Sequence, residues 1–348
     1  MRGLRRVLKL FQKNKAPKQK QYVSAAPKRR VSKKKKKQRI LIGVIVALLL
    51  FSIGTFIKNK IDDQKQIWEQ NQTGTIEKVD ADKKATDDNG NEIETELSAK
   101  ITVLSVGDGD AVFIKNGSIE ALIDTGNGSS NKVSEFAGSE TSGKLDYLIL
   151  TNADSSSAGG LKSVVNEVTV GTFIYAYSPS KGSVTYSSFT DSKSKLKQNS
   201  TTIKKANDQN IDLGDGITLT VQKGLSDGSD SDKNAICVVS YKGDQFIISG
   251  NASDKLLKAK LASDNDVFAF VASNSGAESS NTMKLLNRID PENIIVSSAK
   301  PGKSKTFSKS MYEKLEDKGS IITTYEAGNI EFTITKDSQF SLVEKSNS

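Results

Sequence analysis

The alternation of apolar runs with short polar clusters predicts an α/β domain over residues 99–345. Three apolar runs come first, I-T-V-L-S-V-G-D-G-D-A-V-F-I-K (101–115), A-L-I-D-T-G-N-G (121–128) and L-D-Y-L-I-L-T-N-A-D-S-S-S-A-G-G-L (145–161). Short apolar runs that end in Gly and small polar residues are typical of buried strands. We therefore expect three strands whose polar ends meet at one edge of a sheet.

The remaining apolar runs extend this pattern to the end of the chain. They predict helices at 161–168, 253–261, 281–289 and 308–318, and strands at 172–177, 217–221, 236–241, 246–249, 267–271, 294–297 and 330–335. Elements in this order predict two sheets packed between helices. Residues 178–205 are rich in Ser, Lys and Thr and predict a long exposed insertion over the edge of the site. Its neighbouring aromatic residues would either line a contact surface or, for two of the four, join the core: Tyr175, Tyr177, Tyr186 and Phe189.

The first 98 residues have a different character. Residues 40–57 are continuously apolar or small, close to the ~20 residues that a membrane-spanning helix needs. No cleavage site of small residues follows, so we expect an anchor and not a secretory signal peptide. Residues 1–39 hold seventeen Lys or Arg and no Asp or Glu, which predicts a cytoplasmic tail and an exported C-terminal domain in a single-pass protein. Residues 58–98 are polar and predict a connector.

The pattern of apolar and basic residues in the tail predicts an anionic lipid surface as its partner. Leu4, Val7, Leu8 and Phe11 alternate with Arg and Lys, as in a short amphipathic helix on an anionic lipid surface. Nucleic acid is a less favoured partner, because the tail lacks interleaved aromatic residues. A disordered tail that only sets the membrane topology is the third interpretation.

Composition restricts the chemistry of the domain. The chain has no histidine and one cysteine, Cys237, which lies in an apolar run and is expected to be a core residue. Zinc sites of hydrolases are built from His, Cys and carboxylate ligands. We therefore expect no metal site of that kind, no cofactor and no internal disulfide.

Three motifs resemble those of a known family. V-G-D-G-D-A (106–111), I-D-T-G (123–126) and T-N-A-D-S-S-S-A-G-G-L (151–161) resemble V-G-Q-G-D-A, I-D-T-G and L-T-H-P-H/D-A-D-H-I-G-G-L of the metallo-β-lactamase superfamily, and within it the hydrolase-like domain of ComEC-type DNA-uptake proteins. Residues 233–251, 266–276 and 294–308 resemble later segments of that domain. The resemblance implies an αββα metallo-β-lactamase-like sandwich, here preceded by a single transmembrane helix.

Every histidine of the family pattern is replaced in this chain. By the resemblance, the former active-site edge would hold Asp108, Asp110, Asp124, Asn152, Asp154, Ser156, Ser157, Asn251 and Thr306. Asp154 alone still matches a ligand of the family. We therefore expect no catalytic residues, a pseudoenzyme, and an extracellular binding or scaffold module for a protein or cell-envelope partner.

Two other functions stay open at this point. Asp108, Asp110, Asp124 and Asp154 offer oxygen ligands to Mg or Ca, which would suit a residual hydrolase or nuclease. Serine nucleophiles at 155–157 lack a histidine base. A role in competence or DNA transfer follows from the resemblance, but the 33 basic and 41 acidic residues after residue 39 sum to −8, the wrong sign for binding phosphates.

Overall fold

A computed structural model describes residues 85–86, 92–93, 97–129, 131–262, 266–318, 320–335 and 340–343, all within one compact unit. The predicted tail (1–39), the predicted transmembrane helix (40–57) and most of the connector (58–98) lie outside the described residues. Among the described residues, no helix combines the length and the apolar character that a membrane span requires.

The first sheet contains the three apolar runs that open the domain. Its eight strands lie in the order β17-β16-β3-β4-β5-β6-β7-β8, and β5 to β8 are parallel. Their bounds are Phe340–Val343 (β17), Ile330–Thr335 (β16), Leu97–Val103 (β3), Val112–Asn116 (β4), Ile119–Ile123 (β5), Lys144–Leu150 (β6), Thr169–Tyr175 (β7) and Thr202–Lys205 (β8).

The second sheet holds seven strands in the order β15-β14-β13-β12-β11-β10-β9, and β12 to β15 are parallel. Their bounds are Ser320–Thr323 (β15), Asn293–Val296 (β14), Asp266–Val271 (β13), Asp244–Ile248 (β12), Ile236–Tyr241 (β11), Thr218–Gln222 (β10) and Gln209–Asp212 (β9). A separate two-residue pair joins β1 (Ala85–Thr86) to β2 (Glu92–Ile93).

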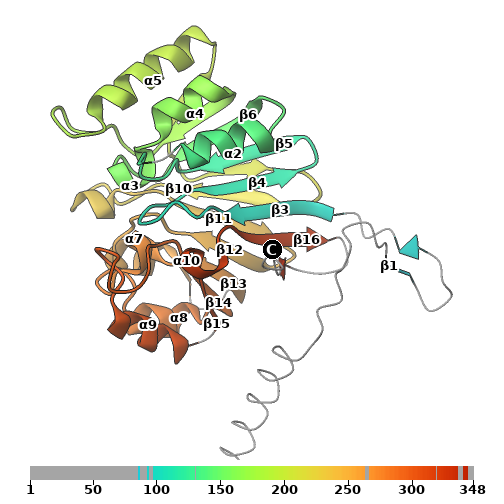
Figure 1. Cartoon of the computed structure of the whole chain (residues 1–348), viewed down its shortest axis with the longest axis vertical. Helices are drawn as coiled ribbons and strands as arrows, with labels where there is room; N and C mark the ends of the chain where they lie inside the picture. The colour runs from blue at the N-terminus through green and yellow to red at the C-terminus, as the bar shows by residue number, and fades with distance from the viewer. Residues whose placement is uncertain are drawn as a thin grey trace, which may run out of the picture. The chain divides into compact units, whose positions relative to one another are not determined.

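Helices cover the outer faces of both sheets (Figure 1). On the first sheet lie α2 (Lys132–Glu140), α4 (Leu161–Glu167) and α5 (Tyr186–Gln198), and on the second lie α6 (Asp254–Lys260), α8 (Met283–Ile289) and α9 (Lys309–Glu316). Short helices occupy the strand ends: α3 (Ser155–Ala158), η1 (Asp230–Asp232), α7 (Ser273–Gly276) and α10 (Thr324–Ala327).

Strand β11 illustrates why strands of this fold appear in the sequence as continuous apolar runs. Cys237 and Val239 point into the core between the two sheets, while Ile236 and Val238 pack under the helices of the second sheet. A strand buried on both faces has no polar alternation. The predicted arrangement of two sheets between helices is thus confirmed as a mixed α/β sandwich, and Cys237 is a buried free cysteine as predicted.

Residues 178–205 differ from the prediction of an exposed insertion. They form the helix α5 and the edge strand β8, which pairs with β7 in parallel. Phe189 and Leu196 lie seven residues apart, on one face of α5, and are buried against the first sheet. Tyr175 and Phe189 belong to the core, whereas Tyr177 is half-buried and Tyr186 is exposed. The sequence did not predict this helix, because Phe189 and Leu196 are the two buried apolar residues in an otherwise polar segment.

Candidate functional site

The loops that carry the sequence motifs meet at one edge of the sandwich. We call this the motif edge, made of residues 107–110, 124–127, 152–157, Asn251 and 273–276. Main-chain hydrogen bonds join its parts: the Asp110 amide donates to Ser156 (3.2 Å), the Thr125 amide to Ser157 (2.6 Å) and the Asn274 amide to Gly250 (2.8 Å). The motif edge therefore brings together most of the predicted site residues.

Glycine is required where two of these loops touch. A Cβ atom on Gly160 would lie 2.2 Å from the Thr125 carbonyl oxygen, and one on Gly109 would lie 2.6 Å from the Ser156 carbonyl oxygen. Real Cβ atoms do not approach backbone this closely, so only glycine lets the main chains pack. This contact explains the glycines of the first and third motifs.

The inner layer of the motif edge is a buried network around Asp124. The Asp124 carboxylate accepts hydrogen bonds from the Thr151 amide (2.8 Å) and hydroxyl (2.6 Å). Asn152 donates to the Thr151 hydroxyl (3.0 Å) and to the Ser157 hydroxyl (2.8 Å). Burial and the neighbouring Asp110 raise the pKa of Asp124 well above its usual range, while the bonds from Thr151 act in the opposite direction. Polar groups that share their hydrogen bonds can be buried at low cost.

Asp110 lies in the same layer without such partners. Its side chain is 1% exposed, and neither carboxylate oxygen has a hydrogen-bond partner among the described residues. Burial raises the pKa of Asp110 to about 7. Asp110 and Asp124 are thus both shielded from water, and burial favours their protonated forms.

The outer rim of the motif edge is formed by Asp154, Ser156 and Asn251. The Asn251 amide nitrogen donates to the Asp154 carboxylate (3.1 Å) and to the Ser156 hydroxyl (2.8 Å). Asp154 is exposed, whereas Asn251 is buried and its side-chain oxygen has no partner within the described part of the chain. The rim thus presents an accessible carboxylate and an unused amide acceptor.

Asp108 and Thr306 lie apart from these two layers. The Asp108 carboxylate accepts hydrogen bonds from the amides of Ala299 and Lys305, both at 2.9 Å. It therefore fastens the loop that carries Thr306 to the first motif. The Thr306 amide donates to the Ser304 hydroxyl (3.2 Å), and among the described residues no hydrogen bond joins Thr306 to the other site residues.

The zinc centre implied by the family resemblance does not fit these residues. The chain has no imidazole, and the described residues contain no group of three or more His, Cys, Asp or Glu that could hold a metal ion. Cys237 is fully buried in β11, and burial raises the pKa of its thiol. Asn152, Ser157 and Asn251 fill former ligand positions with groups that hydrogen-bond to one another or to their neighbours.

A cavity beside the rim was not predicted from the sequence. We call it the Tyr177 pocket. It has a volume of about 330 Å³ and lies between the third motif, the segment after β7 and the η1 loop, lined by Ala153, Asp154, Tyr177, Ser178, Pro179, Ser180, Ser183, Asp230 and Lys233. The Tyr177 hydroxyl donates to the buried Asn234 side chain (3.3 Å). The sequence identified Tyr177 as a candidate contact residue. It did not identify Asp230, Lys233 and Asn234, because these residues belong to no recognisable motif.

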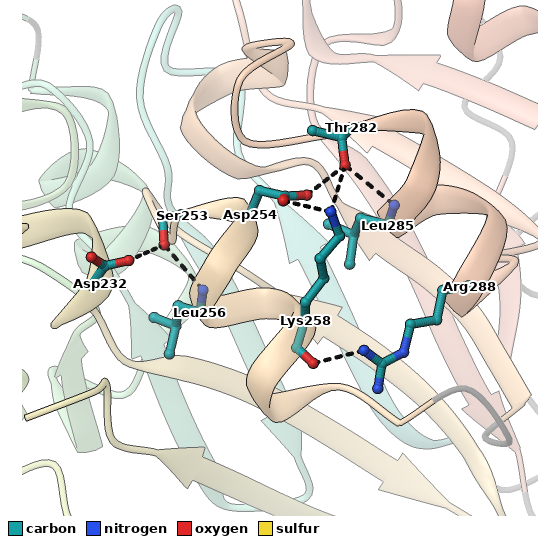
Figure 2. Close-up of polar contacts among 8 residues, drawn as sticks. All are labelled: Asp232, Ser253, Asp254, Leu256, Lys258, Thr282, Leu285 and Arg288. Atoms are coloured by element: carbon teal, nitrogen blue, oxygen red, sulfur yellow. Dashed lines mark hydrogen bonds and ion pairs between the residues drawn. The ribbon is translucent and has the colours of Figure 1, made fainter. Parts of the chain in front are cut away.

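Polar contacts in the second half hold the η1 wall of this pocket in place (Figure 2). The Ser253 hydroxyl donates to Asp232 and accepts from the Leu256 amide (3.1 Å), so it caps α6 and joins it to η1. Asp254 pairs with Lys258 (2.6 Å) and accepts from the Thr282 hydroxyl that caps α8. These contacts hold the loop of Asn251, just before α6, beside the loop of Asp230.

The chain was compared with known families, curated proteins and solved structures. No family model matches the chain, and no curated protein matches its sequence. The structure is similar to solved metallo-β-lactamase-fold proteins. YhfI from Bacillus subtilis is 13% identical, with 65% of this chain and 96% of that one covered and a TM-score of 0.41. Igni18, a metallo hydrolase from Ignicoccus hospitalis, is 12% identical, with 67% and 98% covered and a TM-score of 0.42.

A third similar structure is a diphosphatase of the PhnP family, 11% identical, with 71% of this chain and 100% of that one covered and a TM-score of 0.41. The TM-scores are below 0.5, so the class of fold rests on the two-sheet topology and the position of the motifs. The expectation that this chain is not an enzyme is contradicted by these similar structures, which include a metallo hydrolase and a diphosphatase. We withdraw the interpretation as a pseudoenzyme.

Proposed function

We propose that this chain is a membrane-anchored, exported protein that binds a cell-envelope partner through the motif edge. The observation that carries the proposal is the contrast within that edge: its loops are tightly joined by main-chain contacts, yet its rim exposes the Asp154 carboxylate and leaves the buried Asn251 side-chain oxygen without a partner among the described residues. Rigid loops that present a few unsatisfied polar groups are the usual design of a recognition site.

The membrane placement in this proposal comes from the N-terminal sequence. The basic residues 1–39 precede the apolar residues 40–57, which favours a tail in the cytoplasm, in contact with anionic lipid, and an exported domain. The part of the chain after residue 39 has a net charge of −8. That charge favours a protein or cell-wall partner over nucleic acid, even though the motifs are most similar to those of ComEC-type proteins.

Site-specific cross-linking of the full chain in its native membrane tests this function. A photoreactive amino acid at Ser156 should capture a discrete partner, and one at the exposed Ser139 of α2 serves as the matched control. Ser156→Trp, in a chain that carries the photoreactive residue at Asp154, should abolish the capture without loss of folded protein. Equal capture from both positions, or capture unchanged by Ser156→Trp, would reject the motif edge as the binding surface.

A hydrolase or nuclease that uses a hard divalent ion is the second candidate. Its supporting observation is the Asp110 carboxylate, buried with both oxygens unpartnered beside Asp124. Mg²⁺, Mn²⁺ and Ca²⁺ prefer such oxygen ligands. If an ion binds there, it should raise the melting temperature of the full chain, and Asp110→Asn should remove the shift. Asp154→Ala should then abolish any ion-dependent hydrolysis of phosphodiesters. An unchanged melting temperature with all three ions would remove this candidate.

A further inference from the structure

We propose that the Tyr177 pocket binds an aminated saccharide, that is, a sugar unit with several hydroxyl groups and a protonated amine. The inference rests on the proposed function, because Asp154 belongs both to the rim of the motif edge and to the wall of this pocket. It names the class of ligand that the rim would select.

The shape of the pocket favours a small polar ligand. Its volume of about 330 Å³ is at the lower end of the range for ligand sites in proteins. Three separate segments form its walls, and each is held in place: Thr185 donates to the Ala153 carbonyl (2.8 Å), the Ala176 amide donates to the Leu150 carbonyl (3.0 Å), and Ser253 fastens the η1 loop. The pocket is therefore preformed and does not need a ligand to assemble it.

Two buried amides beside the pocket have hydrogen-bonding capacity left over. Asn234 is fully buried and accepts from the Tyr177 hydroxyl, but its side-chain nitrogen has no partner among the described residues. Asn251 donates to Asp154 and Ser156, but its side-chain oxygen has none. A buried polar group without a partner is unfavourable. Asn234 contacts the lining residue Tyr177 and Asn251 contacts the lining residue Asp154, so the surroundings of the pocket favour a ligand that can donate and accept hydrogen bonds.

The charges of the pocket favour a cationic ligand. Lys233 pairs with Asp230 at 3.4 Å, whereas Asp154 has no cationic partner in the part of the chain that the structure describes. One negative charge therefore stays uncompensated. The phenol of Tyr177 lines the pocket together with both carboxylates, and its pKa is raised by burial and by Asp154, with a smaller effect of Asp230. An ammonium group near Asp154 would gain the ion pair and the face of this aromatic ring.

The other side chains that line the pocket favour a saccharide over a basic peptide as the ligand. Ser178, Ser180 and Ser183 add hydroxyl groups, and Pro179 and Tyr177 supply two small apolar faces. Protein interfaces have an apolar, aromatic-rich centre, which this pocket lacks. A ring with hydroxyl groups around its edge and an apolar face uses all of these features, whereas a Lys side chain would use only the carboxylate and the ring.

Titration calorimetry with the full chain in detergent tests the proposal with three probes. Tri-glucosamine carries the amines, tri-N-acetylglucosamine is the uncharged control of the same size, and trilysine represents a basic peptide. We expect tri-glucosamine to bind at least tenfold more tightly than either control. Asp154→Asn should remove that difference, Tyr177→Ala should weaken binding at least tenfold, and the exposed Asp317→Asn should leave binding unchanged.

Each other outcome overturns the ligand class. Equal binding of the acetylated sugar would exclude a role of the amine, and preferential binding of trilysine would make a basic peptide the ligand. Absence of binding by all three would remove the pocket as a site for amines. The cross-linking experiment at Ser156 separates this failure from a failure of the proposed function, because a captured partner would leave the motif edge as a binding surface.

Discussion

The inner layer and the outer rim of the motif edge have similar side chains but opposite behaviour. In the inner layer, Asp124, Asn152 and Ser157 are buried and bonded to one another or to Thr151. On the rim, Asp154 is exposed and Asn251 keeps an unused acceptor. The inner layer therefore contributes to folding, whereas the rim is the part for which we propose a role in recognition. Carboxylates and amides in one motif serve different purposes according to their access to water.

Asp110 provides the strongest test of the difference between the inner layer and the rim. Its folded pKa is about 7, against an unfolded value of ~3.9. Below pH ~4, Asp110 is protonated in both the folded and the unfolded protein. Between pH ~4 and ~7 it is protonated only in the folded protein. The free energy of unfolding should therefore fall as the pH rises through this window. The loss should approach ~4 kcal/mol above pH ~7.

Urea unfolding of the full chain at pH 4, 5.5, 7 and 8.5, followed by circular dichroism, measures this effect. Asp110→Asn should reduce the slope between pH 4 and 7 without abolishing it, because the pKa of Asp124 is also raised, while Asp154→Asn on the rim should leave the slope in place. A wild-type free energy of unfolding that rises over the same interval would show that Asp110 is ionised and stabilised in the folded protein.

Close packing of the inner layer predicts the second largest effect. Gly160→Ala places a Cβ 2.2 Å from the Thr125 carbonyl oxygen, and relief of that overlap must move main chain. We expect a loss of ~3 kcal/mol in the free energy of unfolding. Gly117→Ala, at a turn with open space and a φ of 55°, is the control and should cost ~1 kcal/mol. Losses of equal size would mean that the loops of the motif edge can separate easily.

The rim predicts the smallest effect on stability. Asp154→Asn keeps the size of the side chain and an oxygen that can accept from Asn251, so the free energy of unfolding should change by less than ~0.5 kcal/mol. The same variant should lose the preference for the amine-bearing sugar. A loss of several kcal/mol in denaturant unfolding would place Asp154 with the inner layer and remove the distinction between the two.

The sequence predicted strands well where at least one face is buried along the whole strand. The strands at 236–241 and 330–335 have the predicted bounds, and helices α6, α8 and α9 lie within the predicted ranges. Helix α5 and strand β8 were missed because a surface helix needs only Phe189 and Leu196 to attach it, and an edge strand is half exposed. The strand β9 is exposed in the same way at alternate positions and carried too weak a pattern.

The sequence predicted that the motif residues meet at one edge, but not which of them are buried, and their role as a functional site stays a prediction. The motifs identified Asp110, Asp124, Asn152, Asp154, Ser156, Ser157 and Asn251, and the structure joins most of them at one edge. They did not indicate that Asp110 would be buried without a partner, because burial depends on neighbours far away in the chain. Asn234 and Asp230 were missed because a pocket wall needs no motif of its own.

The amino-acid sequence by itself determined the class of fold and the absence of an imidazole-based metal centre. Apolar periodicity decides which residues leave water, and a chain without histidine cannot supply that ligand. Tertiary structure alone decided which carboxylates are buried and where a cavity forms. Asp154, Tyr177 and Asp230 meet at one pocket although they are distant in sequence, because β6 and β7 end where β11 begins, as the hydrogen bond from the Ala235 amide to the Thr151 carbonyl shows.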